Sequence, residues 1–367
     1  MLLNRLRRVN EKNRNEFLGI FLHRYPAFVW SDAEPDDIPA FVFHDVTPEA
    51  LKPLLEYLTE NRYTTLTADE YVERASTGEH GAKREVLLTF DDSHESLYSV
   101  AYPLLKRYGQ KAVAYVVPGR IENSRTSGTF PLCNWPQIRE MNRTGVIDIQ
   151  SHSMFHHSIP ISSCVVDFVR PGLNFSFLNG DFAPVREKES IQESGFVPFG
   201  YPIHDWGARM REAPAYMENT GVINTCIDYV ASRGGEEFFR MPGGRRTLRA
   251  VLKDSRLRNP PGRFENEDEQ RIAMLEDFIA SKREIERQLP GKNVRHYCFP
   301  WFRGSRLASA LSFEAGYVSN AWGSLVSSTM RYSEEKILHI TRLPCRYIFR
   351  LPGRGRRGLS RVLTHRA

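Results

Sequence analysis

Two groups of polar residues have the types and spacing that metal chemistry requires. Asp91 and Asp92 directly follow the apolar run EVLLTF, and His152 and His156 stand four residues apart after the run VIDIQ. Two imidazoles at this spacing can face one side of a short turn, and one carboxylate added to them leaves open positions for water and substrate. Such a ligand set suits Zn²⁺ and other divalent transition metals.

Each group also has a structural interpretation. One aspartate of an isolated pair often caps the following helix, and a histidine cluster is often only a polar loop. Both groups, however, follow short runs of strand length, and ligands bind at the carboxyl ends of strands in parallel α/β folds. The combination therefore favours a metal site more than either group does alone.

Strand-like and helical segments alternate along most of the chain. Five apolar runs have strand length: 40–46, 85–90, 111–117, 146–150 and 294–301. Capping residues at Thr47, Thr67 and Asn134 indicate helix starts, because their side chains can accept hydrogen bonds from free amides. This order predicts a mostly parallel sheet with helical crossovers, either doubly wound or closed into a barrel.

The alternation weakens at about residues 160–265, where Gly, Pro and aromatic residues are frequent and no period is sustained. We interpret this stretch as a large insertion over one end of the sheet. The expected organisation is a lead-in at 1–38, a main domain at 39–350 that contains the insertion, and a basic tail at 351–367.

The composition is that of a globular protein, with 41% hydrophobic and 26% charged residues among 367. No apolar run reaches the roughly 20 residues of a membrane span. The N-terminus has no secretory signal pattern, and the five scattered cysteines argue against a disulfide framework, so we expect a cytoplasmic location. The net charge of +6 comes largely from the two ends, and we expect no nucleic-acid partner. The oligomeric state stays open.

The residues around both groups resemble those of a known family, the polysaccharide deacetylases of the NodB-homology type (carbohydrate esterase family 4). TFDD at 89–92 is similar to its first motif, and HSMFH at 152–156 is similar to its second. Further similar segments are FHDVTPEALKPLLEYLTENRYTTLT, LLKRYGQKAVAYVVPG, WPQIREMNRTGVIDIQSH and SKREIERQLPGKNVRHYCFPW. The resemblance covers about residues 38–160 and 265–350.

This resemblance implies a distorted (β/α)7-type barrel with the metal at the carboxyl ends of the strands. Asp91 would be the general base. Three residues would bind one divalent ion, with Zn as the first candidate and Co, Ni or Mn as alternatives: Asp92, His152 and His156. The substrate would be an amino sugar or polysaccharide precursor that carries an N-acyl group, and a cytoplasmic setting would favour a precursor over an assembled polymer.

The sequence departs from the family pattern at two places. Many members have an arginine two residues before the proline of a later motif, but Cys298 precedes Pro300 here, which leaves Arg240 in RMPGG as a candidate substitute. The family's histidine acid follows the pattern Leu-x-His, and His339 in KILHITRLP is its nearest match. Two other histidines are alternative candidates: His44 and His204.

Several residues are candidates for contact with a sugar ring, with ordinary packing as the alternative: Pro300, Trp301, His44, Tyr201 and Arg240. The sequence as a whole predicts a metal-dependent hydrolase that removes an N-acyl group, N-acetyl first, from an amino sugar. Two rival functions stay open. One is an amidase or deformylase acting on a small non-polymeric molecule, and the other is a carbohydrate-binding barrel without catalysis.

Overall fold

The structure is a computed structural model that describes residues 25–77, 84–121, 131–173, 197–211, 213–322 and 337–364. These residues fall into two compact units. Unit 1 lies within Met1–Ser153, Ser281–Phe302 and Gly316–Ala367, and unit 2 lies within Met154–Ala280 and Arg303–Ala315. The stretch interpreted as an insertion, about 160–265, falls within unit 2.

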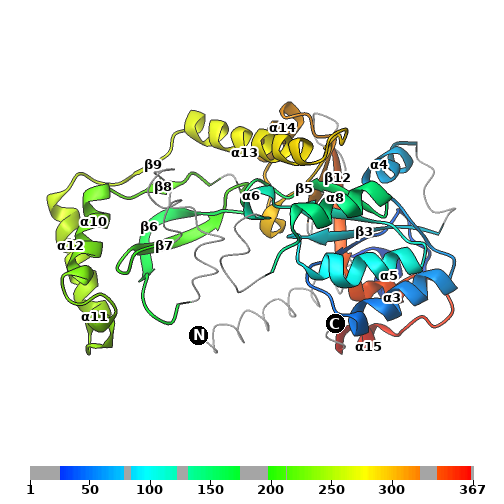
Figure 1. The fold of residues 1–367 in the computed structure, drawn as a ribbon, viewed down its shortest axis with the longest axis horizontal. Helices are drawn as coiled ribbons and strands as arrows, with labels where there is room; N and C mark the ends of the chain where they lie inside the picture. Colours follow the sequence, from blue (N-terminus) through cyan, green and yellow to red (C-terminus); the bar gives the residue numbers. More distant parts are fainter. Residues whose placement is uncertain are drawn as a thin grey trace. The chain divides into compact units, whose positions relative to one another are not determined.

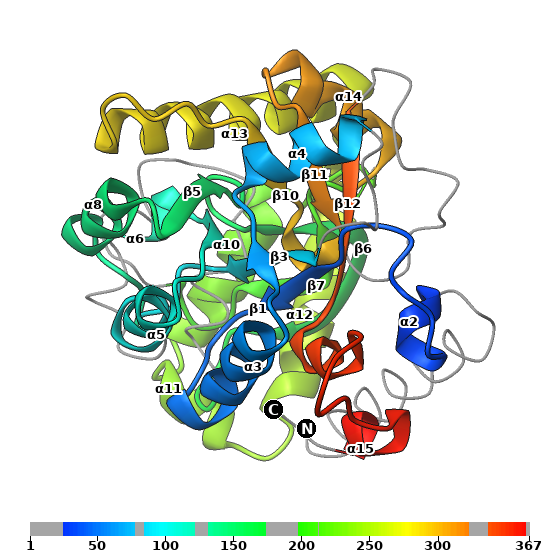
Figure 2. The same ribbon diagram turned by 90° about the vertical axis from the view of Figure 1, so that its right-hand side faces the viewer.

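Unit 1 is built around a closed barrel of seven parallel strands (Figures 1 and 2). The order around the barrel is β1-β12-β11-β10-β5-β4-β3, and β3 pairs with β1 to close it, while β2 pairs with the start of β3. The strands are β1 (Ala40–Phe43), β2 (Thr64–Thr65), β3 (Glu85–Asp91), β4 (Ala112–Val116), β5 (Ile147–Ser151), β10 (His296–Cys298), β11 (Ser319–Trp322) and β12 (Leu338–Pro344). The predicted seven-stranded barrel is confirmed, and the doubly wound alternative is excluded.

The barrel is distorted at the seam between β5 and β10. These strands share a single register pair, Tyr297 with Ser151, whereas β4 and β5 pair over five positions. A strand as short as β10, His296–Cys298, offers few backbone groups for a ladder. The two strands at this seam end next to His152 and at Cys298, so the irregular pairing lies beside residues that carry chemistry.

Helices follow the strands around the outside of the barrel, where Figure 2 shows α3, α5 and α8. The helices of unit 1 are α2 (Ala27–Trp30), α3 (Pro48–Glu60), α4 (Ala68–Thr77), the π-helix η1 (Leu97–Ala101), α5 (Tyr102–Arg107), α6 (Pro118–Ile121), α8 (Trp135–Thr144), η2 (Pro300–Phe302), η4 (Cys345–Arg350) and α15 (Leu359–Thr364). The three predicted caps are confirmed, since Thr47, Thr67 and Asn134 each accept a hydrogen bond from the backbone amide three residues later. None of the helices among the described residues has the length and apolar character needed to cross a membrane.

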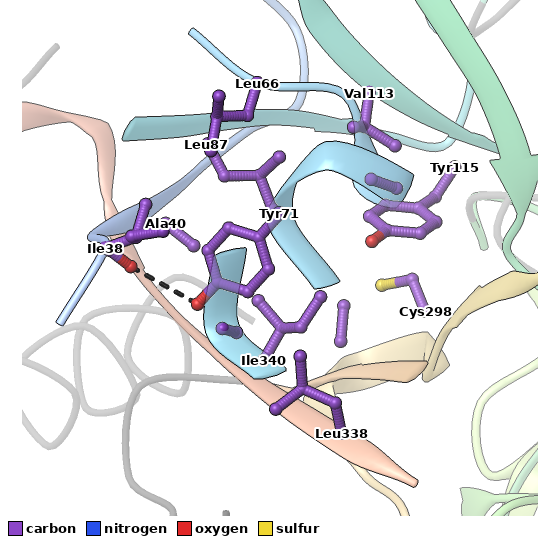
Figure 3. Close-up of a cluster of buried hydrophobic side chains, with 13 residues drawn as sticks. Ile38, Ala40, Leu66, Tyr71, Leu87, Val113, Tyr115, Cys298, Leu338 and Ile340 are labelled. Carbon is purple, nitrogen blue, oxygen red and sulfur yellow. Dashed lines mark hydrogen bonds between the residues drawn. The ribbon is translucent and has the colours of Figure 1, made fainter. Parts of the chain in front are cut away.

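Apolar side chains fill the barrel at the end where the strands begin (Figure 3). Leu87 of β3, Val113 of β4 and Ile340 of β12 belong to one buried cluster, together with Tyr71 of α4. The Tyr71 hydroxyl donates to the Ile38 carbonyl oxygen at 3.2 Å, which fixes the ring over this end. The helix α4 thus closes the start of the strands, whereas ligands in parallel barrels bind at the carboxyl ends.

Unit 2 contains a two-stranded antiparallel ribbon of β6 and β7 together with several helices. Its elements are β6 (Ser158–Phe168), β7 (Pro202–Ala208), β8 (Tyr216–Met217), α10 (Thr220–Ala231), α11 (Glu236–Arg240), α12 (Gly244–Arg258), β9 (Arg263–Phe264) and α14 (Arg306–Glu314), and α13 (Glu267–Gln288) begins in this unit. Val222 of α10 and Leu248 of α12 lie in its apolar core with Phe168 of β6.

Glu218 is the centre of a buried polar network in unit 2. Its carboxylate accepts from Arg256 Nε at 2.9 Å and lies 3.2 Å from His204 Nε2, and the Tyr216 hydroxyl donates to it at 3.3 Å. Burial alone would raise the pKa of Glu218, but its hydrogen bonds to His204 and Arg256 outweigh this and lower it to about 2. His204, an alternative candidate acid in the sequence, is therefore engaged as a partner of Glu218.

We expect Glu218 to make the free energy of unfolding decrease at acidic pH. Its folded pKa of about 2 lies below the ordinary 4.5, so its stabilising contribution is complete above 4.5 and is lost as the pH falls toward 2. The stability advantage of the wild type over Glu218→Gln should shrink by about 2 kcal/mol over that range, after allowance for solvent screening. Urea unfolding at several pH values measures this, and a constant difference would contradict it.

Candidate active site

Strained backbone gathers at the carboxyl ends of three barrel strands. Seven non-glycine residues among the described ones have positive φ, and six of them lie within five residues after the end of β3, β5 or β10: Asp92, Ser93, Ser153, His156, Trp301 and Phe302. Left-handed backbone is costly for such residues and persists where the surroundings hold it, which is common at functional sites. The clustering marks this end of the barrel independently of the residue types.

Asp92, His152 and His156 form one candidate ligand set. Each offers one ligand atom, and these atoms lie within 4.8 Å of one another. His152 Nε2 lies 3.3 Å from Asp92 Oδ1, and His152 Nδ1 lies 2.9 Å from the Cys298 carbonyl oxygen. Since a carbonyl can only accept, Nδ1 donates to it, which leaves Nε2 as the ring atom that faces Asp92 and could bind a cation. A carboxylate and two imidazoles fit a divalent transition metal.

A second group of three, Asp91, His152 and Cys298, also brings three possible ligand atoms within 4.8 Å of one another. The Arg342 guanidinium lies against two of its members, 3.0 Å from the Cys298 sulfur and within 2.9 Å of both Asp91 oxygens. A fixed positive charge at this position repels a cation. Burial also raises the pKa of the Cys298 thiol, which disfavours the thiolate that a metal needs. The set that contains Asp92 is therefore the better candidate.

Asp91 and Arg342 form a buried bidentate ion pair. Arg342 Nη1 donates to Asp91 Oδ1 at 2.6 Å and Nη2 donates to Oδ2 at 2.9 Å, and the two residues are 1% and 2% exposed. Burial alone would raise the pKa of Asp91, but the adjacent guanidinium outweighs it and holds the pKa below its ordinary value. Asp91 is thus ionised at neutral pH, with both oxygens fixed in place.

The sequence did not identify Arg342 as the partner of Asp91. The family pattern places this arginine near Pro300, and Arg240 was the candidate substitute. Cys298 occupies the expected position on β10, and the guanidinium reaches Asp91 from β12 instead. One signal in the sequence could have found it. Leu338 and Ile340 lie in the barrel core, and a charged residue two positions further faces the same interior, where burial requires a partner.

Two of the candidate substrate residues lie in unit 2. Arg240 is 64% exposed on α11 and pairs with Glu236 and Glu237 of the same helix. Tyr201 is half-buried, and burial, with a smaller contribution from Glu218, raises its pKa to about 12.

Two further candidates, Pro300 and Trp301, follow β10 in the short helix η2. Pro300 is buried and Trp301 is half-buried with a positive φ of 59°. The next residue, Phe302, was not a candidate in the sequence, but its ring lies close to residues of the site. Its ring centroid lies 5.9 Å from that of His44 and 5.3 Å from the Arg342 guanidinium carbon. Phe302 therefore lies beside both groups.

The structure separates the two main candidates for the histidine acid. His44 directly follows β1, and its Nε2 lies 4.0 Å from Asp91 Oδ2 with 43% of the side chain exposed. Its withdrawal from water lowers its pKa, and the nearby carboxylates oppose this only in part. His339 is three positions from Arg342 on β12, so it faces away from the barrel interior, and its ring packs 5.1 Å from that of Trp322.

Comparisons with known proteins agree with this geometry. Residues 78–170, which include both motifs, match the family model for polysaccharide deacetylase. YxkH of Bacillus subtilis, which is named as a polysaccharide deacetylase, is 28% identical over 136 residues, or 35% of this chain and 46% of that protein. The poly-beta-1,6-N-acetyl-D-glucosamine N-deacetylase of Staphylococcus epidermidis is 28% identical over 116 residues, or 32% of this chain and 39% of that protein.

Two solved structures share the fold. The de-N-acetylase of Aggregatibacter actinomycetemcomitans has a TM-score of 0.52 and 16% identity, with 83% of this chain and 94% of that one covered. The BpsB deacetylase domain of Bordetella bronchiseptica has a TM-score of 0.51 and 16% identity, with 84% and 97% covered.

Residues 78–170 thus match the polysaccharide deacetylase family, and the barrel fold is shared with solved deacetylase structures. The resemblance inferred from the sequence is confirmed. The chain spans less than half the length of the two curated relatives above.

We expect His152→Ala to reduce the metal content of the purified protein, because it removes a nitrogen from the candidate ligand set. Asp91→Asn should retain the metal, since Asp91 is engaged by Arg342. Elemental analysis after dialysis against Zn²⁺ measures both. Full metal content in His152→Ala, with a melting temperature equal to that of the wild type, would show that the cation lies elsewhere.

Proposed function

We propose that this protein is a metal-dependent hydrolase that removes an N-acyl group, N-acetyl first, from an amino sugar in a carbohydrate. The observation that carries the proposal is the position of an oriented, ionised carboxylate directly beside a three-residue donor set. Asp91 supplies the carboxylate, and Asp92 with His152 and His156 supplies the donors.

Asp91 acts as the general base that takes a proton from the attacking water. Its oxygens are held by two N–H groups of Arg342, so the carboxylate does not rotate away from the reacting water. The same ion pair lowers the basicity of Asp91. It also keeps the carboxylate ionised, and therefore able to accept a proton, at neutral pH.

His44 passes a proton to the departing nitrogen, in place of His339. Three facts support this choice: His44 lies 4.0 Å from Asp91, it is accessible, and its lowered pKa leaves it free to accept a proton at neutral pH. The proton that Asp91 takes from water can then move to His44 and on to the amine. The edge of the site next to His44 is formed by Phe302.

A divalent ion bound by the donor set would polarise the acyl carbonyl and lower the pKa of a water in its open position. We propose zinc because two imidazoles and one carboxylate suit it, with Co, Ni or Mn as alternatives.

The proposed substrate is an N-acetylated amino sugar, and the relative from Staphylococcus epidermidis, named for poly-beta-1,6-N-acetyl-D-glucosamine, makes β-1,6-linked oligomers the first to test. The five free cysteines support our proposal of a reducing, cytoplasmic compartment, which cell fractionation would test.

The first experiment is acetate release from a panel of N-acetylglucosamine oligomers by metal-loaded protein. Asp91→Asn should lower kcat by at least about 100-fold, because the base is lost, while the metal content is retained. Full activity in Asp91→Asn would contradict the assigned role.

The same panel distinguishes the rival functions. Formate or ammonia released from small amides, without acetate from sugars, would favour an amidase or deformylase. Sugar binding without release of any acyl group would favour a carbohydrate-binding barrel.

We expect His44→Gln to lower kcat by about 100-fold or more, with a smaller effect on KM, because it removes the proton donor to the departing amine. His339→Gln is the matched control and should keep kcat near that of the wild type. The opposite ranking of the two variants would restore His339 as the acid.

A further inference from the structure

His94 lies beside the carboxylate of Asp92, and the proposed reaction uses it nowhere. Its Nε2 lies 3.9 Å from Asp92 Oδ2, while the other oxygen, Oδ1, lies 3.3 Å from His152 Nε2. The carboxylate is thus placed between two imidazole rings, with one ring on each oxygen. The oxygen that faces the candidate ligand His152 is not the oxygen that faces His94.

The backbone around His94 is fixed from a second segment. The Cys133 amide donates to the Ser93 carbonyl at 2.8 Å, the Cys133 thiol donates to the His94 carbonyl at 3.2 Å, and the Glu95 amide donates to the Pro131 carbonyl at 2.9 Å. These bonds lie on both sides of His94. They hold a turn in which Asp92 and Ser93 both have positive φ, 69° and 60°.

Local preference does not explain this turn. A left-handed non-glycine residue costs on the order of 1 kcal/mol, and two in succession cost more. The contacts with residues 131–133 offset that cost, and the result is that the side chain at 94 returns toward the carboxylate at 92. The side chain of His94 is only 17% exposed, so its ring is held beside Asp92 and does not extend into solvent.

We propose that His94 is a positioning residue for the candidate metal site, where it orients Asp92 through Oδ2 so that Oδ1 faces the cation. This inference rests on the metal site of the proposed function. Carboxylates that bind metals are commonly held by a second partner, and loss of that partner weakens metal affinity by about 10- to 100-fold. His152 is held on its own second side by a hydrogen bond of 2.9 Å to the Cys298 carbonyl.

The test measures Zn²⁺ affinity by competition with a chromogenic chelator, which does not depend on turnover. His94→Ala and His94→Asn should each bind Zn²⁺ about 10- to 100-fold more weakly, because neither side chain reaches Oδ2. His94→Gln should retain most of the affinity, because its longer amide can donate from nearly the same place. His339→Gln, on the outer face of β12, is the control and should match the wild type.

Melting temperatures of the metal-free variants separate a folding defect from a binding defect, and if His94→Ala does not fold, His94→Asn and His94→Gln carry the comparison. Zn²⁺ affinity within about twofold of the wild type in both His94→Ala and His94→Asn would overturn the inference. Tight Zn²⁺ binding by a wild type that releases no acyl group would end the proposed function and leave the role of His94 standing.

Discussion

The site depends on one buried ion pair, between Arg342 and Asp91. A guanidinium and a carboxylate that are both almost inaccessible to solvent must satisfy each other, because removal of one partner would leave an uncompensated charge that costs about 3–5 kcal/mol. The bidentate geometry also removes the rotational freedom of Asp91. The ion pair between Asp91 and Arg342 therefore does two things: it neutralises two buried charges, and it holds the Asp91 carboxylate ionised and oriented for proton transfer.

The ion pair also decides where a cation can lie. Without Arg342, the buried group of Asp91, His152 and Cys298 would compete with the group that contains Asp92. With the guanidinium against Asp91 and Cys298, positive charge is already present on that side, so the donors on the other side are favoured. Adjacent carboxylates, Asp91 and Asp92, can in this way take different roles although their residue type is the same.

Unfavourable backbone conformations are concentrated at the carboxyl ends of the strands. Six strained residues lie within five positions after the ends of three strands, and the seam between β5 and β10 has a single register pair. Packing at the other end, where α4 closes an apolar core, supplies stability, and buried polar groups there are paired, as His296 is with Asp69 of α4. Stability and chemistry are thus separated along the barrel axis, which allows the carboxyl ends of the strands to hold costly conformations.

The sequence by itself determined the alternation of strands and helices, the caps at Thr47, Thr67 and Asn134, and the resemblance to the polysaccharide deacetylases, which implied the barrel. These features rest on contacts between residues near each other in the chain, or on runs whose period is visible locally. The aspartate and histidine motifs were visible for the same reason, since each lies within a few residues.

Only the tertiary structure decided which residues complete the site. Arg342 is 251 residues from Asp91, and a guanidinium can reach the same carboxylate from any neighbouring strand, so its spacing in the sequence carries no signal. His44 and His339 both follow apolar residues, and only the direction of each side chain from its strand distinguishes them. The fold of unit 2 was likewise hidden, because short elements joined by long-range packing leave no sustained period in the sequence.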